Sequence, residues 1–148
     1  MPACFSILTV LISALLFPAS AAEPDGRGRL IFTGDILLSR QVEREMLKTK
    51  GFPWKHLVPL FIKAVFIMGN FEGAAGKAED CPAALSEKQL CFAVREEFMP
   101  VLAKAGFTAV GIENNHANDL GPEGKKRTQE SLNKTGVAAL NFEDSPYF

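Results

Sequence analysis

Short hydrophobic runs alternate along the chain with segments in which apolar and charged residues recur at helical spacing. Four runs predict buried strands, because each is short, apolar and partly β-branched and lies beside turn residues. They cover residues 30–33, 64–68, 107–112 and 137–142. Helical spacing predicts helices over residues 39–48, 96–104 and 121–136, with a helical turn at 56–61. Strands alternating with helices predict an α/β domain with a largely parallel sheet.

Residues 74–90 lack strong periodicity and are rich in Ala and charge, so they predict an excursion loop. The loop contains Cys81, and Cys91 follows ten positions later. In an oxidising compartment this pair would form a disulfide worth roughly 3 kcal/mol in loop entropy. Zinc binding is the alternative, which is disfavoured because neither a CxxC pair nor a nearby His accompanies the cysteines.

The N-terminus has the pattern of a secretory signal peptide. Residues 5–17 form an apolar run that Pro18 ends, and small residues follow, with cleavage after Ala21 or Ala22 fitting equally well. An uncleaved anchor is disfavoured because a bilayer span needs about 20 apolar residues; a buried core helix is the other alternative. The predicted organisation is a signal peptide at 1–22, a linker at 23–29 and one domain at 30–148. We therefore expect a secreted, periplasmic or cell-envelope protein without a stable transmembrane anchor after cleavage.

Charge is nearly balanced, with a formal net charge of -1. No Lys/Arg cluster alternates with aromatic residues, so nucleic acid is not an expected partner. The longest basic run, at residues 125–127, is interpreted as the solvated face of a helix.

Polar residues stand directly after three of the predicted strands. They are Asp35 after the first strand, Asn70 and Glu72 after the second, and Asn115 and His116 after the third, with Asp119 behind them. Because ligands of open α/β sheets bind at the carboxyl ends of the strands, one site could be built from all three. Its oxygen-rich donors and single imidazole suit Mn, Mg, Zn or Fe.

Each of these three clusters also has a purely structural interpretation. Asp35 could cap the following helix, and Glu72 could be a solvated loop acid. Asn114 and Asn115 could supply left-handed turn conformations. His116 could be a hydrogen-bonded loop histidine.

Asp119 is the residue of this group that is most easily explained as structural, because Asp119-Leu-Gly-Pro resembles the entry to a helix. His56, on the predicted helical turn, is assigned no functional role.

Three motifs occur in order, each at a strand end: FTGDILLSR, MGNFEG and GIENNHANDLG. Together they resemble the capsule-synthesis (CapA, poly-gamma-glutamate) family, which is related to calcineurin-like metallophosphoesterases. Thr128, Leu132 and Gly136 extend the resemblance, which covers roughly residues 30–140. The resemblance implies the N-terminal half of a layered α/β/β/α sandwich.

The resemblance also implies a role for each site residue. Asp35 resembles a ligand of the first metal, Glu72 an acid that can bridge two metals, and Asn115 a ligand of the second. His116 resembles the residue that contacts the substrate oxyanion or protonates the leaving group. Two divalent ions would clamp the attacking and leaving oxygens and lower the pKa of a bound water to about 7. Asn70, Asn114 and Asp119 would support these groups.

Two departures from the family pattern stand out. Glu113 occupies a position where the family usually has Ala, and an extra acid there would alter charge near the metals. Family members also continue with further metal-binding His residues, whereas this chain ends at Phe148. We therefore expect an incomplete site, an open sheet edge, and a chain that folds poorly or dimerises by itself.

The function expected from the resemblance is metal-dependent hydrolysis or transfer on an anionic envelope polymer such as poly-gamma-glutamate. A non-catalytic accessory protein of a capsule synthesis or export complex is the first alternative. A secreted phosphoesterase acting on phosphoester substrates is the second. A shared fold does not decide among these functions.

Overall fold

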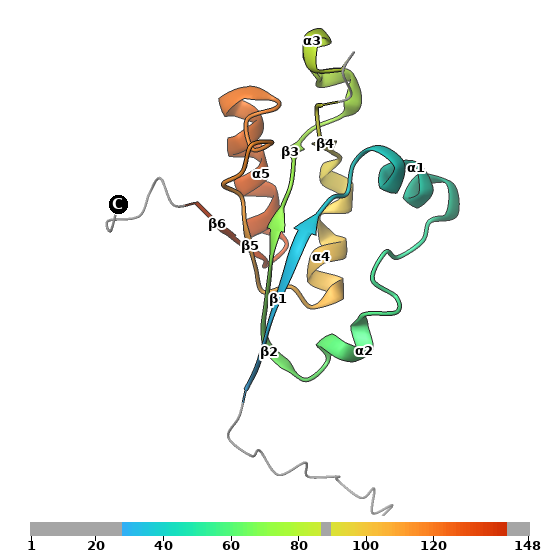
Figure 1. The fold of residues 1–148 in the computed structure, drawn as a ribbon, viewed down its shortest axis with the longest axis vertical. Coiled ribbons are helices and arrows are strands. Elements are labelled where there is room, and N and C mark those ends of the chain that lie inside the picture. The colour runs from blue at the N-terminus through green and yellow to red at the C-terminus, as the bar shows by residue number, and fades with distance from the viewer. Residues whose placement is uncertain (1–27, 87–89, 142–148) are drawn as a thin grey trace, which may run out of the picture.

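A four-stranded parallel sheet forms the centre of the computed structural model, which describes residues 28–86 and 90–141 (Figure 1). The strands lie in the order β1-β2-β5-β6. Their bounds are β1 (Arg29–Ile36), β2 (Ala64–Phe71), β5 (Ala109–Gly111) and β6 (Ala138–Leu140). Each pair of neighbours is parallel. The predicted α/β class with a largely parallel sheet is confirmed.

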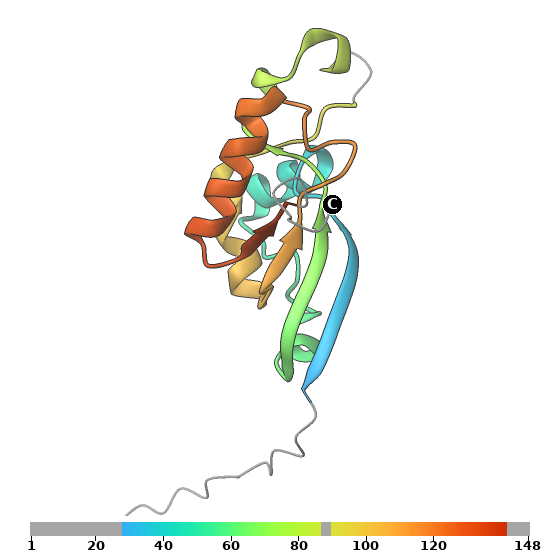
Figure 2. The same cartoon turned by 90° about the vertical axis from the view of Figure 1, so that its left-hand side faces the viewer.

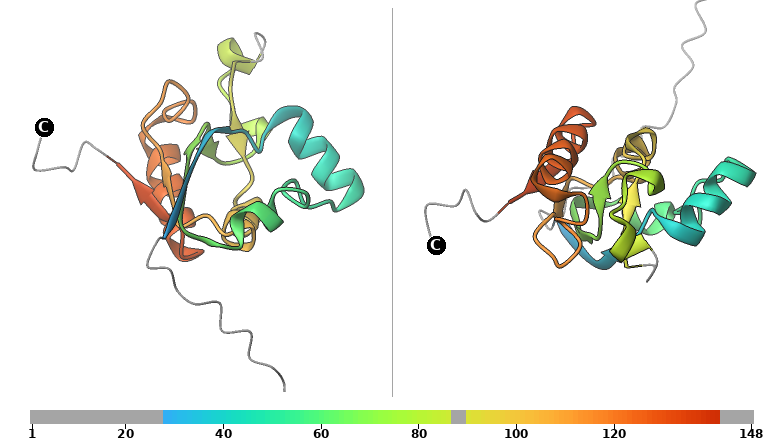
Figure 3. Two further views of the ribbon diagram at one scale, coloured as in Figure 1. Left: turned by 60° about the horizontal axis from the view of Figure 1, so that its bottom comes forward. Right: turned by 90° about the horizontal axis from the view of Figure 1, so that it is seen from above.

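The helices that follow the strands lie on one side of the sheet (Figure 2). Their bounds are α1 (Arg40–Thr49), α2 (Val58–Phe61), α4 (Pro100–Ala105) and α5 (Gly121–Lys134). Helix α5 lies beside β6, and α1 lies beyond the opposite edge of the sheet (Figure 3). Helix α1 begins and ends one residue later than predicted, and α5 begins at the predicted residue and ends two residues earlier.

The single helix predicted over residues 96–104 is wrong. The structure has a 3-10 turn, η2 (Glu96–Phe98), followed by α4, which begins at Pro100. Proline has no backbone N–H and cannot continue a helix that starts four residues earlier, although it fits the first turn of a new one.

The predicted loop at residues 74–90 contains short elements. They are β3 (Ala74–Ala75), η1 (Ala78–Asp80) and α3 (Ala83–Ser86). Strand β3 pairs in parallel with β4 (Ala93–Val94), which the sequence did not indicate because two residues show no periodicity. A disulfide joins Cys81 to Cys91 across this excursion.

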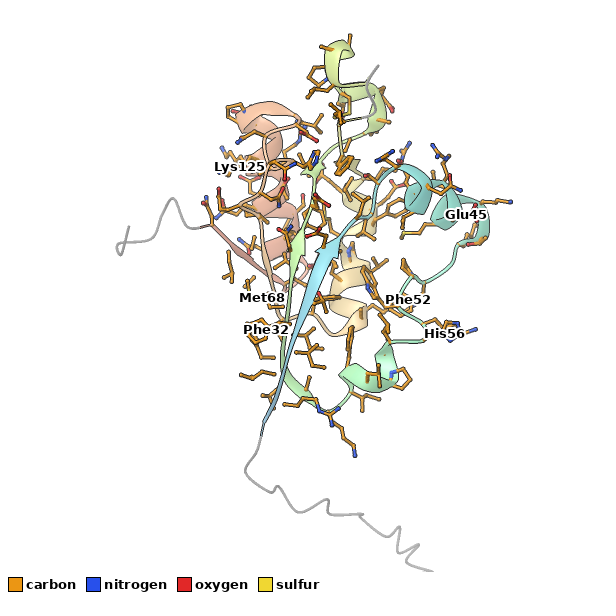
Figure 4. All side chains as sticks on the ribbon, in the orientation of Figure 1. Phe32, Glu45, Phe52, His56, Met68 and Lys125 are labelled. Atoms are coloured by element: carbon orange, nitrogen blue, oxygen red, sulfur yellow. A yellow bond between two sulfur atoms is a disulfide. The ribbon has the colours of Figure 1, made fainter. Side chains whose placement is uncertain are left out.

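The two faces of the four-stranded sheet differ. On the helical side, Ile67, Val110 and Leu132 are buried in one core with Leu102 of α4. On the other side, Leu30 is 59% and Phe32 68% exposed. Phe32 is in register with Met68 there (Figure 4). Apart from the two-stranded sheet of β3 and β4, the described residues contain no second sheet of the kind that the predicted sandwich requires.

The predicted signal peptide at residues 1–22 lies outside the described residues, as does most of the predicted linker. Strand β1 begins at Arg29, which pairs with Ala64, so the end of that linker is already part of the sheet. Within residues 28–86 and 90–141, no helix combines the length and hydrophobicity needed to cross a membrane.

The buried hydroxyl of Thr128 joins α5 to β3. It accepts the Ala75 N–H at 2.7 Å and donates to the Gly124 carbonyl at 2.8 Å. Thr128→Val leaves the Ala75 N–H buried without a partner, which is expected to lower the free energy of unfolding by about 1–3 kcal/mol in urea denaturation. The control is Thr49→Val at an exposed position of α1, which is expected to change the free energy of unfolding by less than about 0.5 kcal/mol. Equal effects of the two substitutions would contradict the assigned role of Thr128.

Candidate functional site

The carboxyl ends of β1 and β2 bring Asp35 and Asn70 side by side. The two residues are in register, and the Asn70 amide donates to Asp35 Oδ1 at 2.8 Å. The Asn114 amide in turn donates to Asn70 Oδ1 at 3.0 Å. The interpretation of Asp35 as a helix cap is wrong, because the N-cap of α1 is Ser39. The register of the sheet places the Asp35 carboxylate in a polar cluster instead.

Asn114 fixes the loop that follows β5. Its amide also donates to the Phe71 carbonyl at 2.9 Å, and its Oδ1 accepts the His116 N–H at 3.0 Å. Among the described residues, only Arg40 and Lys50 have a positive φ apart from glycines. The left-handed interpretation of the paired asparagines is therefore wrong, and Asn114 acts through its side chain.

The imidazole of His116 is held on two sides. Its Nδ1 lies 2.8 Å from Asp119 Oδ2, and its ring stacks on Phe92 with centroids 3.8 Å apart and planes at 16°. An ionised carboxylate can only accept, so Nδ1 carries the proton of this hydrogen bond. Nε2 is left facing Glu72, whose Oε1 lies 3.9 Å away. Glu72 is only 20% exposed in its side chain, so it is not a fully solvated loop acid.

Asp119 positions the residues around it rather than only marking the start of α5. It is 7% exposed, and the oxygen that binds His116 also accepts the Phe92 N–H at 2.7 Å. One carboxylate thus fixes both the imidazole and the backbone of the ring stacked on it. The contact of Phe92 with His116 was not predicted from the sequence. The one sequence signal for it is that Phe92 directly follows Cys91, whose disulfide restrains the backbone there.

The structure gives Glu113 and the basic run at residues 125–127 different surroundings from those that the sequence predicted. Glu113 forms an ion pair with Lys125 at 2.9 Å, so its charge is compensated locally. Lys125 is only 12% exposed in its side chain, and Arg127 donates to the Ala75 carbonyl at 3.1 Å. The run is therefore not simply a solvated face, because β3 and the loop after β5 pack on the first turns of α5.

The remaining predicted residues lie at the surface. Asn115 is exposed, and its side chain makes no hydrogen bond within the part of the chain that the structure describes. His56 is also exposed.

The donors at the strand ends fit a divalent cation in their chemistry but are few in number. They are two carboxylates, an imidazole and several amide oxygens, which suit a hard or borderline ion. No three His, Cys, Asp or Glu side chains in residues 28–86 and 90–141 are grouped so that they could hold a metal. Asn115, predicted as a ligand, is available because its amide is not otherwise bonded there.

The role assigned to Asp119 predicts a stability effect. Asp119→Ala leaves the buried Phe92 N–H without an acceptor and frees the His116 ring, so the free energy of unfolding should fall by about 1–3 kcal/mol. Chemical denaturation measures this change, and one-dimensional NMR of the imidazole protons should show a shifted His116 signal. Asn118→Ala, at the exposed neighbour, is the control. An unchanged His116 signal in Asp119→Ala would rule out the positioning role.

Comparison with known proteins shows which family the chain resembles in sequence. Residues 29–140 match the family described as bacterial capsule synthesis protein PGA_cap. The chain is 26% identical over 121 residues to the capsule biosynthesis protein CapA of Bacillus anthracis, covering 78% of this chain and 29% of that protein. It is 29% identical over 130 residues to the PGA biosynthesis protein CapA of Bacillus subtilis (strain 168), covering 82% of this chain and 33% of that protein.

The chain thus spans about a third of the length of these curated relatives. The matched segment contains all four strands of the main sheet. It also contains every residue of the polar group at the strand ends, called the strand-end cluster below: Asp35, Asn70, Glu72, Asn114, Asn115, His116 and Asp119. The chain belongs to the bacterial capsule synthesis protein family PGA_cap.

Proposed function

We propose that the protein is an exported capsule-synthesis protein whose strand-end cluster binds divalent metal ions and acts in hydrolysis or transfer on an envelope polymer such as poly-gamma-glutamate. The observation that carries this proposal is the hydrogen-bonded series from Asp35 through Asn70 and Asn114 to His116. It unites three strand ends in one polar cluster. The names of the two relatives, a capsule biosynthesis protein and a PGA biosynthesis protein, support the capsule polymer as the substrate class.

Asp35, Glu72 and Asn115 are the residues that would hold the metal ions, with Asn70 and Asn114 orienting the carboxylate and the loop. Bound divalent ions would supply charge stabilisation for the attacking and leaving oxygens. His116 would contribute through Nε2, the ring nitrogen that Asp119 does not bind. The neutral ring would accept a proton there, and the doubly protonated ring would contact an oxyanion or protonate a leaving group. The stacked ring of Phe92 shields one face of the imidazole from water.

Export is the part of the proposal that rests on the N-terminal sequence. The apolar run at residues 5–17 and the small residues after it have the order of a signal peptide. The Cys81–Cys91 disulfide supports the same conclusion, because disulfides persist in oxidising compartments.

Metal binding is the direct test of the proposal. Isothermal titration with Mn²⁺ should detect binding to the full chain, and Asp35→Asn should weaken it by more than about tenfold because the substitution removes a charged ligand at constant shape. Glu130→Gln, which removes an exposed acid on α5, is the matched control and should bind like the wild type. Absence of Mn²⁺ binding by the wild-type chain would refute the metal-dependent function.

A non-catalytic accessory role is the second candidate, and the small number of acidic donors among the described residues favours it. The two functions differ in turnover. Hydrolysis of poly-gamma-glutamate and of a generic phosphodiester should be compared in wild type and His116→Ala. Metal binding without turnover of either substrate would support the accessory role, whereas cleavage of the phosphodiester alone would support a secreted phosphoesterase.

A further inference from the structure

A cleft of about 510 Å³ lies between helix α1 and the disulfide-bonded excursion. Its lining includes Arg40, Glu43 and Arg44 of α1 on one side, and Cys81, Cys91 and Arg95 on the other. Three arginines and one glutamate therefore face the same space. None of these four charged residues belongs to the predicted metal site.

The charges in the cleft do not cancel. Arg95 donates to Glu43 in an ion pair, and this hydrogen bond raises the pKa of the Arg95 guanidinium. Glu43 is therefore neutralised by Arg95. Arg40 and Arg44 have no carboxylate partner within the part of the chain that the structure describes. Among residues 28–86 and 90–141, the Arg44 side chain donates hydrogen bonds only to the neutral side chain of Gln41.

Arg40 connects this cleft to the strand-end cluster. Its guanidinium lies 5.3 Å from the centroid of the Phe92 ring, whose stacking partner is His116. The backbone of Arg40 has a φ of 58°, a left-handed conformation that costs free energy for any residue except glycine. Arg40 is thus held in a strained position beside the aromatic ring, and its N–H donors stay free for a ligand.

A second observation at the same cleft concerns the Ser39 side chain, which also lines it. Ser39 is 2% exposed, and its hydroxyl has no hydrogen-bond partner among the described residues. Buried hydroxyls normally have a partner, because an unsatisfied one costs free energy. An anionic oxygen bound at the cleft would supply an acceptor close to this hydroxyl.

We propose that the cleft is a binding subsite for the carboxylate groups of an acidic polymer, held by the guanidinium groups of Arg40 and Arg44. Planar guanidinium donors match carboxylates in geometry and charge. The identity of the polymer rests on the proposed function, whereas the anion-binding property does not require a metal. The Arg40, Phe92 and His116 stack would place the bound chain next to the strand-end cluster.

Fluorescence anisotropy with labelled poly-gamma-glutamate, in a chelating buffer at physiological ionic strength, tests this subsite in the full chain. Arg44→Gln and Arg40→Gly should each weaken binding by roughly tenfold, because each removes charge-assisted hydrogen bonds. Glycine suits the left-handed backbone at position 40, so Arg40→Gly should keep a Tm close to that of the wild type. Lys48→Gln, which removes an exposed charge from the same helix, is the control and should retain wild-type affinity.

The chelator separates this test from that of the metal-dependent function. Arginine-dependent binding in chelator supports the subsite even if Mn²⁺ titration shows no metal site. If Lys48→Gln lowered the affinity for poly-gamma-glutamate as much as Arg44→Gln, binding would depend on general charge attraction alone, and the proposal would be overturned. If polyphosphate bound as tightly as poly-gamma-glutamate, the assignment to carboxylates would be overturned. The same would hold if the wild-type chain bound neither polymer.

Discussion

The side-chain amide of Asn114 is the interaction on which the polar cluster depends. It donates to the side chain of Asn70 and to the backbone of Phe71, and it accepts the N–H of His116. A parallel sheet brings its strand ends to one edge, but it does not fix the loops that leave them. This single amide orients the loop after β5 against β2, and Asn70 extends the connection to Asp35 on β1.

A second constraint reaches the cluster from the disulfide-bonded excursion. Cys91 is joined to Cys81, and the next residue, Phe92, stacks on His116 and donates its N–H to Asp119. The excursion therefore forms one wall around the imidazole rather than a peripheral loop. The guanidinium of Arg40, which lines the basic cleft, lies over the same aromatic ring, so Arg40 links the cleft to the wall of the strand-end cluster.

The sequence predicted most of the helices and strands that are marked by hydrophobic periodicity and by turn residues at their ends. Buried runs and turn residues located the four strands of the main sheet, and the register then placed Asp35 beside Asn70. It did not predict β4, which is too short to show alternation, or the break that Pro100 makes between η2 and α4. Phe92 was missed because its stacking on a histidine 24 positions later depends on tertiary packing, which no local pattern encodes.

We propose that the three strand ends form one site for divalent metal. Anomalous diffraction from crystals of the chain grown with Mn²⁺ tests it most directly, because the signal locates the ion independently of any assay. A metal ion bound at the strand ends should give an anomalous peak in contact with the Asp35 carboxylate, on the side of the sheet edge where Glu72 and His116 lie. The proposed site would be ruled out if crystals grown at saturating Mn²⁺ gave no peak at Asp35, or a peak only at a site remote from all three strand ends.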